Sequence, residues 1–121
     1  MTYNEVLDLQ ISNIIAHTSD MLGLVKTCLG ILGNSTLKDD EIIMLINGAV
    51  ADMIRQNIDV AGNITDGLIQ STIVMYVKAN YEMLDEVDRK RAYELYKQQC
   101  TNLSLSQKYL LEEVIDVLPN D

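Results

Sequence analysis

LIQSTIVMYVKANY, residues 68–81, is apolar on nearly every side, because only Gln70, Ser71, Thr72, Lys78 and Asn80 interrupt it. A helix of this composition is normally buried at the centre of its domain. If its own chain does not bury it, a neighbouring chain must. We therefore predict an all-α fold, a small bundle of four to five helices, in which a helix over about residues 67–81 is central.

A short amphipathic helix is predicted over residues 20–32, well before the central one. Its start has N-cap candidates in Thr18-Ser19-Asp20, and Gly33-Asn34 accept the left-handed backbone that ends helices. The inward stripe at i, i+3 and i+4 spacing consists of Met21, Leu22, Val25, Cys28, Leu29 and Leu32. Residues 1–17 mix helical and two-residue spacing, so they fit a helix or an extended piece; we favour the helix.

The next helix is predicted from a capping box of Thr36 and Asp39 to about Asn57. Its apolar residues keep a clear 3.6-residue period from Ile42 to Ile54. Gly48 lies inside this helix at a cost of up to ~1 kcal/mol relative to Ala. Either another helix approaches closely there, or the glycine is simply tolerated.

Residues 58–66 form a predicted loop that leads to an N-cap at Thr65. The loop contains Ile58, Val60 and Ile64, which is an unusual apolar content for a solvated turn. These side chains exceed what one small bundle should need, and they are therefore candidates for contacts with another chain.

The sequence pattern of the C-terminal third predicts one long helix, a break and a short tail. Asp85 or Glu86 opens the helix, and residues 104–108 are the break. The helix's inward stripe is Ala92, Leu95, Tyr96, Cys100 and Leu103. The tail has the apolar stripe Leu110, Leu111, Val114, Ile115 and Leu118, with Glu112, Glu113 and Asp116 opposite it. An isolated helix this short is marginal in water, so it must dock on its own core or on a neighbouring chain.

Size and charge restrict the class of protein. The 121 residues, 48% of them hydrophobic, suit a single helical domain over 1–121, with an N-terminal extension at 1–19 and an amphipathic tail at 107–121 available for assembly. A net charge of −9 argues against general nucleic-acid binding and against an anionic membrane surface. The basic cluster Arg89-Lys90-Arg91 lies among acids and indicates a solvated helix face. We expect no signal peptide and no membrane span.

No catalytic, metal or cofactor site is predicted. His17 has no adjacent Cys, and no glycine-rich elbow precedes a serine. Asp39-Asp40-Glu41 are consecutive, so they are better explained as acids at a positive helix end. Cys28 and Cys100 lack companion ligands and are interpreted as buried hydrophobes in a reducing compartment. The protein is therefore not expected to be an enzyme, although acid pairs that converge only in three dimensions are invisible at this level.

The order of these segments resembles the head-tail connector (adaptor, or head-completion) proteins of tailed bacteriophages over about residues 21–106. The residues that carry the resemblance are Val25-Lys26 with Leu29 and Leu32, Asp40-Glu41-Ile42-Ile43 with Leu45-Ile46, Tyr76-Val77-Lys78-Ala79-Asn80-Tyr81-Glu82, and Leu103-Ser104-Leu105-Ser106.

The resemblance implies a structural virion protein without cofactors, assembled in the host bacterial cytoplasm. It implies a homo-oligomer, a dodecameric ring beneath the portal protein, with the next tail or head-completion protein below and viral DNA passing through the centre. A ring needs heterologous interfaces, for which our candidates are the surplus apolar residues. They are Ile58, Val60, Ile64, Leu110, Leu111, Val114, Ile115 and Leu118. The alternative is a small acidic cytosolic regulatory or DNA-mimicking binding protein.

Overall fold

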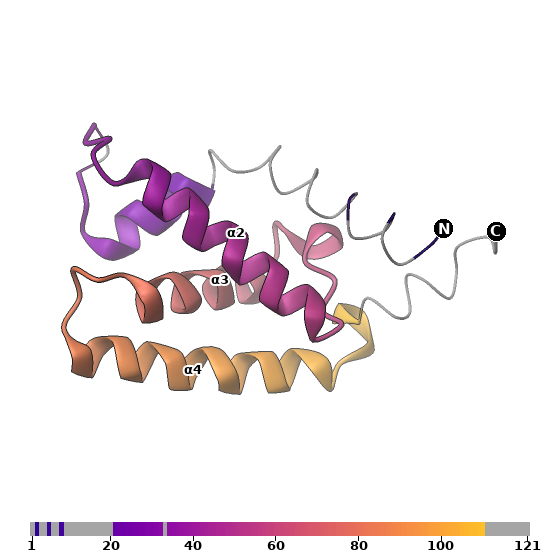
Figure 1. Cartoon of the computed structure of the whole chain (residues 1–121). Helices are drawn as coiled ribbons and strands as arrows, with labels where there is room; N and C mark the ends of the chain where they lie inside the picture. The colour runs from indigo at the N-terminus through magenta and orange to yellow at the C-terminus, as the bar shows by residue number, and fades with distance from the viewer. Residues whose placement is uncertain (1, 3–4, 6–7, 9–20, 33, 111–121) are drawn as a thin grey trace.

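The computed structural model describes residues 2, 5, 8, 21–32 and 34–110 of the chain (Figure 1). Residues 21–29 are helical, and the elements that follow are α2 (Asp39–Arg55), the 3₁₀ turn η1 (Ala61–Asn63), α3 (Gly67–Asn80), α4 (Glu86–Ser104) and the 3₁₀ turn η2 (Gln107–Tyr109). In this part of the chain the only extended pairing is one isolated antiparallel bridge between Ile58 and Leu110. The prediction of a small all-α bundle is confirmed.

Helix α3 is the centre of the bundle, as its composition predicts. It packs against α4 in an antiparallel hairpin and against α2 on another side (Figure 1). Ile69, Ile73 and Val77 of α3 are completely buried, and they meet core side chains from α2 and α4. The apolar sequence of this helix is thus used mainly within its own chain.

The helix at 21–29 ends earlier than predicted, at Gly30 and not at Gly33-Asn34. Gly30 adopts a positive φ of 75°, the Ile31 N–H donates to the Lys26 carbonyl at 2.9 Å, and the Gly30 N–H donates to the Thr27 carbonyl at 3.1 Å. This is the Schellman pattern, in which a glycine in the left-handed region closes the last turn. Leu32 therefore lies beyond the helix and is 76% exposed.

Helix α2 begins without the predicted capping box. Its N-cap position is Lys38, and no side chain caps it. The Asp39 carboxylate instead lies 2.9 Å from Lys26 Nζ, so it is paired with the preceding helix. At the other end Asn57 takes a φ of 63°, and the Ile58 N–H donates to the Met53 carbonyl at 3.1 Å. An asparagine here plays the role that glycine plays at residue 30.

Helices α3 and α4 both begin at an aspartate. Asp66, and not the predicted Thr65, is the N-cap of α3, because its carboxylate accepts from the Leu68 N–H at 2.8 Å. Asp85 caps α4 by accepting from the Asp88 N–H at 2.8 Å, as predicted. A carboxylate at this position satisfies otherwise unpaired N–H groups and favourably meets the positive end of the helix.

Gly48 in α2 marks a close approach of α3. A Cβ added at this position would lie 3.1 Å from the hydroxyl oxygen and 3.4 Å from Cε1 of Tyr76. Gly48 therefore lies at a close contact with another helix and is not simply tolerated. The group that approaches it is the Tyr76 side chain of the central helix.

The loop between α2 and α3 belongs to the core. Ile58 and Val60 are completely buried, Ile64 is 8% exposed, and all three join the single core cluster of the described residues. The premise that these side chains are surplus to the domain is therefore wrong. The polar backbone of the loop is satisfied locally, since the Asp59 carboxylate accepts from the Gly62 N–H and the Asn63 amide donates to the Asp59 carbonyl.

Candidate assembly surface

The base of the C-terminal tail is fixed to the start of α3. Tyr109 donates its hydroxyl proton to Asp66 Oδ2 at 2.9 Å, and Lys108 Nζ pairs with the same oxygen at 3.2 Å. The Leu68 N–H, followed by the Tyr109 hydroxyl and Lys108, lowers the pKa of the Asp66 carboxyl below its ordinary value. The hydrogen bond to Asp66 in turn raises the pKa of Lys108. The single residue Asp66 therefore caps α3 and holds η2.

A backbone contact adds to this attachment. The Asp59 N–H donates to the Tyr109 carbonyl at 2.7 Å, next to the bridge between Ile58 and Leu110. Leu110, the first residue of the predicted tail stripe, is half-buried at this point. Leu111, Val114, Ile115 and Leu118 lie outside the described residues, so their interface role stays a prediction.

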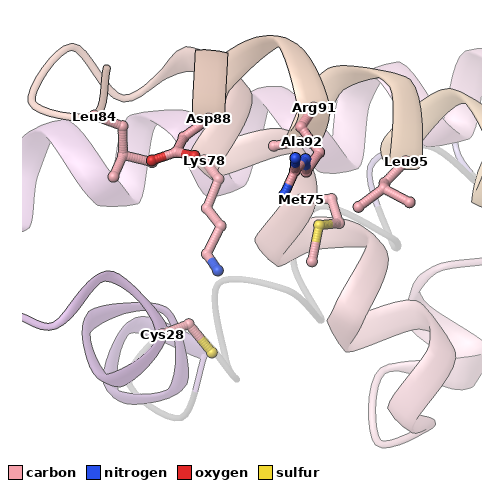
Figure 2. A pocket seen from close by; sticks show the side chains of 8 residues that line it. All are labelled: Cys28, Met75, Lys78, Leu84, Asp88, Arg91, Ala92 and Leu95. Atoms are coloured by element: carbon pink, nitrogen blue, oxygen red, sulfur yellow. The ribbon is translucent and has the colours of Figure 1, made fainter. Parts of the chain in front are cut away.

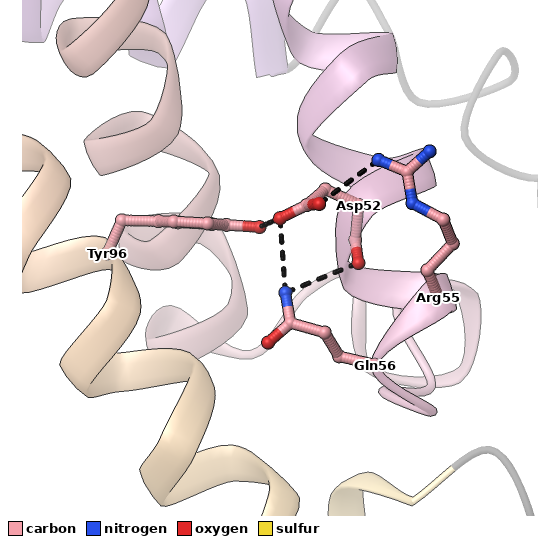
Figure 3. Close-up of polar contacts among 4 residues, drawn as sticks. All are labelled: Asp52, Arg55, Gln56 and Tyr96. Carbon is pink, nitrogen blue, oxygen red and sulfur yellow. Dashed lines mark hydrogen bonds and ion pairs between the residues drawn. The ribbon is translucent and has the colours of Figure 1, made fainter.

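A second polar cluster, which is partly exposed, joins α2 to α4 (Figure 3). The Asp52 carboxylate accepts from the Tyr96 hydroxyl at 2.6 Å, from the Gln56 amide at 3.1 Å and from Arg55 at 3.1 Å. Burial, followed by the hydrogen bond to Asp52, raises the pKa of the Tyr96 phenol, which therefore stays protonated as a donor. The cluster fixes the distance between two helices.

Cys100 lies near this cluster and is buried, as predicted. Burial raises the pKa of its thiol above the ordinary value. A nucleophilic cysteine requires the opposite shift, because the thiolate is the reactive species. Cys100 is therefore placed as a small core residue. His17, the chain's single histidine, lies outside the described residues.

Two residues assigned to inward stripes instead face a groove. Cys28 is exposed, and Leu95 of α4 is 41% exposed. Cys28 faces the space into which Met75 and Lys78 of α3 project (Figure 2).

The groove follows α3 between helical residues 21–29 and α4. It consists of two adjoining cavities of about 220 Å³ and about 260 Å³, both of which include Cys28, Met75 and Lys78. The α4 side contributes Ala92 and Leu95. We did not predict this groove, although a lysine within an otherwise apolar helix, Lys78, indicates the side of α3 that reaches solvent.

Further apolar side chains are exposed at one end of the bundle. The segment that joins residues 21–29 to α2 and the turn between α3 and α4 lie at the same end of the view in Figure 1. Leu32 and Leu37 of that segment are 76% and 92% exposed, and Met83 and Val87 at the turn are each 70% exposed. Leu105, beyond the C-terminal end of α4, is 81% exposed.

Residues 2, 5, 8, 21–32 and 34–110 contain no group of three or more His, Cys, Asp or Glu side chains that could hold a metal ion. Among the same residues no helix has both the length and the apolar content that a membrane span requires.

Comparison with known proteins identifies the family. The family model described as "Phage connector protein" matches residues 21–109. No curated protein and no solved structure matches the chain. The matched range begins at the first continuously described helix and ends at η2, so it includes the whole described bundle. It also agrees with the resemblance carried by residues 21–106, and the chain therefore belongs to the phage connector protein family, as a structural helical-bundle protein of the head-tail connector type.

Proposed function

We propose that this connector forms a closed ring at the junction between the portal of the capsid and the tail. DNA passes through the ring, and the next tail or head-completion protein docks below it. The observation that carries the proposal is the family match over residues 21–109. The dodecameric number is the one implied by the resemblance, and we propose assembly in the host bacterial cytoplasm before incorporation into the virion.

The distribution of exposed apolar side chains supports a head-to-tail contact. Leu37 and Met83 lie in segments at one end of the bundle, whereas Leu105 follows the far end of α4. A ring is built from heterologous interfaces, in which one face of a subunit meets a different face of the next. A subunit with apolar groups at separate places suits such an arrangement better than a two-fold dimer.

The charge of the chain suits a passage for DNA. Its net charge is −9, and a negative channel wall repels phosphates, so DNA slides without adhering. No catalysis is proposed, because the family is structural and the polar clusters around Asp52 and Asp66 tie helices together.

The test is assembly with the portal protein encoded by the same phage. We expect native mass spectrometry and negative-stain microscopy to show a closed ring of this chain, either alone or seated on the portal. A chain that stays monomeric or dimeric and does not bind the portal would contradict the proposal. That outcome would favour the acidic regulatory or DNA-mimicking protein.

A further inference from the structure

The outward face of α2 carries no charge after its first turn. Three consecutive acids begin the helix at residues 39–41, and residues 42–51 then contain no charged side chain. This uncharged part still reaches solvent, because Met44 is 70% exposed and both Asn47 and Ala51 are exposed. Depletion of charged residues is a property of the centre of protein interfaces. In a chain of net charge −9, such a face is suited to a protein contact.

The outward face of α4 has the same order with the opposite sign. After the acids of its first turn, three bases and one acid occupy residues 90–97, and residues 98–107 contain no charged side chain. The four charged residues, all exposed, are Lys90, Arg91, Glu94 and Lys97. In the uncharged part Thr101 is exposed, and Leu105 at the C-cap is 81% exposed. A charged part therefore precedes an uncharged part on both faces, negative on α2 and positive on α4.

Helical spacing places each set of residues on one side of its helix, because positions three and four apart are neighbours. The α2 stripe consists of Asp40, Met44, Asn47 and Ala51. The α4 stripe consists of Lys90, Arg91, Glu94, Lys97, Gln98, Thr101 and Leu105. The buried residues of the two helices, from Ile42 to Ile54 and from Ala92 to Leu103, lie on their other sides. Asp40 to Ala51 and Glu94 to Leu105 each span roughly 16 Å along the helix, so the stripes match in length.

The direction of the two helices decides how the stripes can meet. Helices α2 and α4 run in the same direction through the bundle, whereas α3 runs in the opposite one (Figure 1). Neighbours in a closed ring are related by a rotation, which is small when the ring has many subunits. The α2 of one copy therefore keeps nearly the direction of α4 in the next. Parallel packing brings the acidic start of α2 to the bases of α4, whereas antiparallel packing would bring it to the uncharged end.

We propose that the α2 stripe of one copy packs in parallel on the α4 stripe of the next copy. This inference rests on the proposed ring, and it names the contact that joins neighbouring subunits. The contact is heterologous, because the stripes are different surfaces of one chain. Asp40 then lies among three bases that outnumber Glu94, and Met44 packs on the uncharged part of α4. Arg55, the next outward residue of α2, already pairs with Asp52 at 3.1 Å.

Pairs of introduced cysteines test this contact in the full chain. The starting variant is Cys28→Ser, which removes the exposed thiol and leaves Cys100 buried. Met44→Cys is combined with Gln98→Cys or with Thr101→Cys, and the chain is oxidised with copper phenanthroline, both alone and with the portal protein present. Each copy then has one thiol on either side of the contact. We expect at least one pair to form a ladder of disulfide-linked multimers on a non-reducing gel.

The matched control combines Met44→Cys with Tyr93→Cys. Tyr93 is 52% exposed, but it precedes Glu94 by one residue and is therefore turned about 100° away around α4. We expect the control pair to cross-link much less than the stripe pairs. Equal ladders from control and stripe pairs would overturn the proposal. A covalent dimer as the main product of Met44→Cys alone would also overturn it, because α2 would then face a second α2.

An exchange of charges tests the same contact without cysteine chemistry. Asp40→Lys in one chain, and Lys90→Glu with Lys97→Glu in another, should each lose most of their rings in native mass spectrometry through like-charge contacts. Mixing the two variants should restore rings, because alternating copies join parent to parent surfaces and exchanged to exchanged surfaces. Glu82→Lys makes the same change of charge at an exposed residue outside both stripes, and it should assemble as the parent chain does.

Circular dichroism spectra establish that each variant is folded. With folded variants, a mixture that forms no rings would overturn the proposed contact, and so would rings that form undiminished from either variant alone. If the parent chain forms rings in these cases, the proposed function stands and only the choice of surfaces is wrong. A parent chain that forms no ring, either alone or on the portal, would overturn both.

Discussion

The Tyr96 hydroxyl lies 2.6 Å from Asp52 Oδ2, and this bond joins α4 to α2 on either side of the central helix. We expect Tyr96→Phe to lower the free energy of unfolding by about 1 kcal/mol, because a part-buried hydrogen bond to a charged acceptor is lost. Urea denaturation followed by circular dichroism measures the change. Tyr93→Phe is the matched control, since Tyr93 lies one turn earlier in α4 and is 52% exposed. Equal losses in the two variants would show that the bond to Asp52 adds nothing.

Lys26 connects the first described helix to α2. It is 5% exposed, pairs with Asp39 at 2.9 Å and donates to the Ser35 carbonyl. Lys26→Met keeps most of the volume but leaves Asp39 without this cation, so we expect a loss of about 1 to 3 kcal/mol. Lys38→Met is the control, because its pair with Glu41 is 3.6 Å long and half-exposed, and such pairs contribute about 0 to 1 kcal/mol. Thermal melts that rank the two variants in the reverse order would refute this assignment.

Two glycines in helices should respond in opposite directions to substitution. A side chain larger than alanine at Gly48 meets the Tyr76 ring, so we expect Gly48→Leu to destabilise the chain by about 1 to 3 kcal/mol through overpacking. Gly23 lies in the helical residues 21–29 with no atom within 4 Å of an added Cβ. There Gly23→Ala should stabilise by up to ~1 kcal/mol through helix propensity. Chemical denaturation curves of both variants test the contrast, and a stabilising Gly48→Leu would contradict the close packing.

Acid should loosen the base of the tail. The pKa of Asp66 is depressed in the folded chain, so its stabilising contribution is complete above the ordinary aspartate value of 3.8 and is lost as the pH falls below it. Hydrogen exchange of residues 105–110 should therefore rise, after correction for intrinsic rates, as the pH falls through the folded-state pKa of Asp66. Asp66→Asn is the control, because the amide keeps an oxygen for the Leu68 N–H but has no charge for Lys108. In this variant the pH dependence should flatten, and an unchanged profile would place the sensitivity in another carboxyl group.

The periodicity of apolar residues predicted the bundle well, because the residues at those apolar positions are the ones that form the core. Residues from Ile42 to Ile54 and from Ile69 to Val77 are buried at the expected spacing. Helix ends were less predictable, since Thr65 and Asp66 are both good caps and only the backbone geometry selects Asp66. Asp39 lies in the first turn of α2, as predicted, but its ion pair with Lys26 of the preceding helix could not be predicted from local spacing.

The candidate surface was harder to predict than the core. Sequence patterns show that a residue is apolar, but they do not show whether another element of the chain covers it. Ile58 and Val60 therefore looked available and are buried, while Cys28 and Leu95 looked buried and line a groove. At Ile58 the cover includes residues 107–110, which return to the loop after α2.

The return of the chain at residues 107–110 has a mechanical consequence. Tension along the C-terminal tail acts first on the Asp59–Tyr109 backbone bond and on the side chains bound to Asp66. These contacts resist the tension together, because they hold residues 108 and 109 to Asp59 and Asp66, before the force reaches the last turn of α4. A pull on Leu110 is therefore carried into the loop after α2 and into the start of α3 before it loads α4.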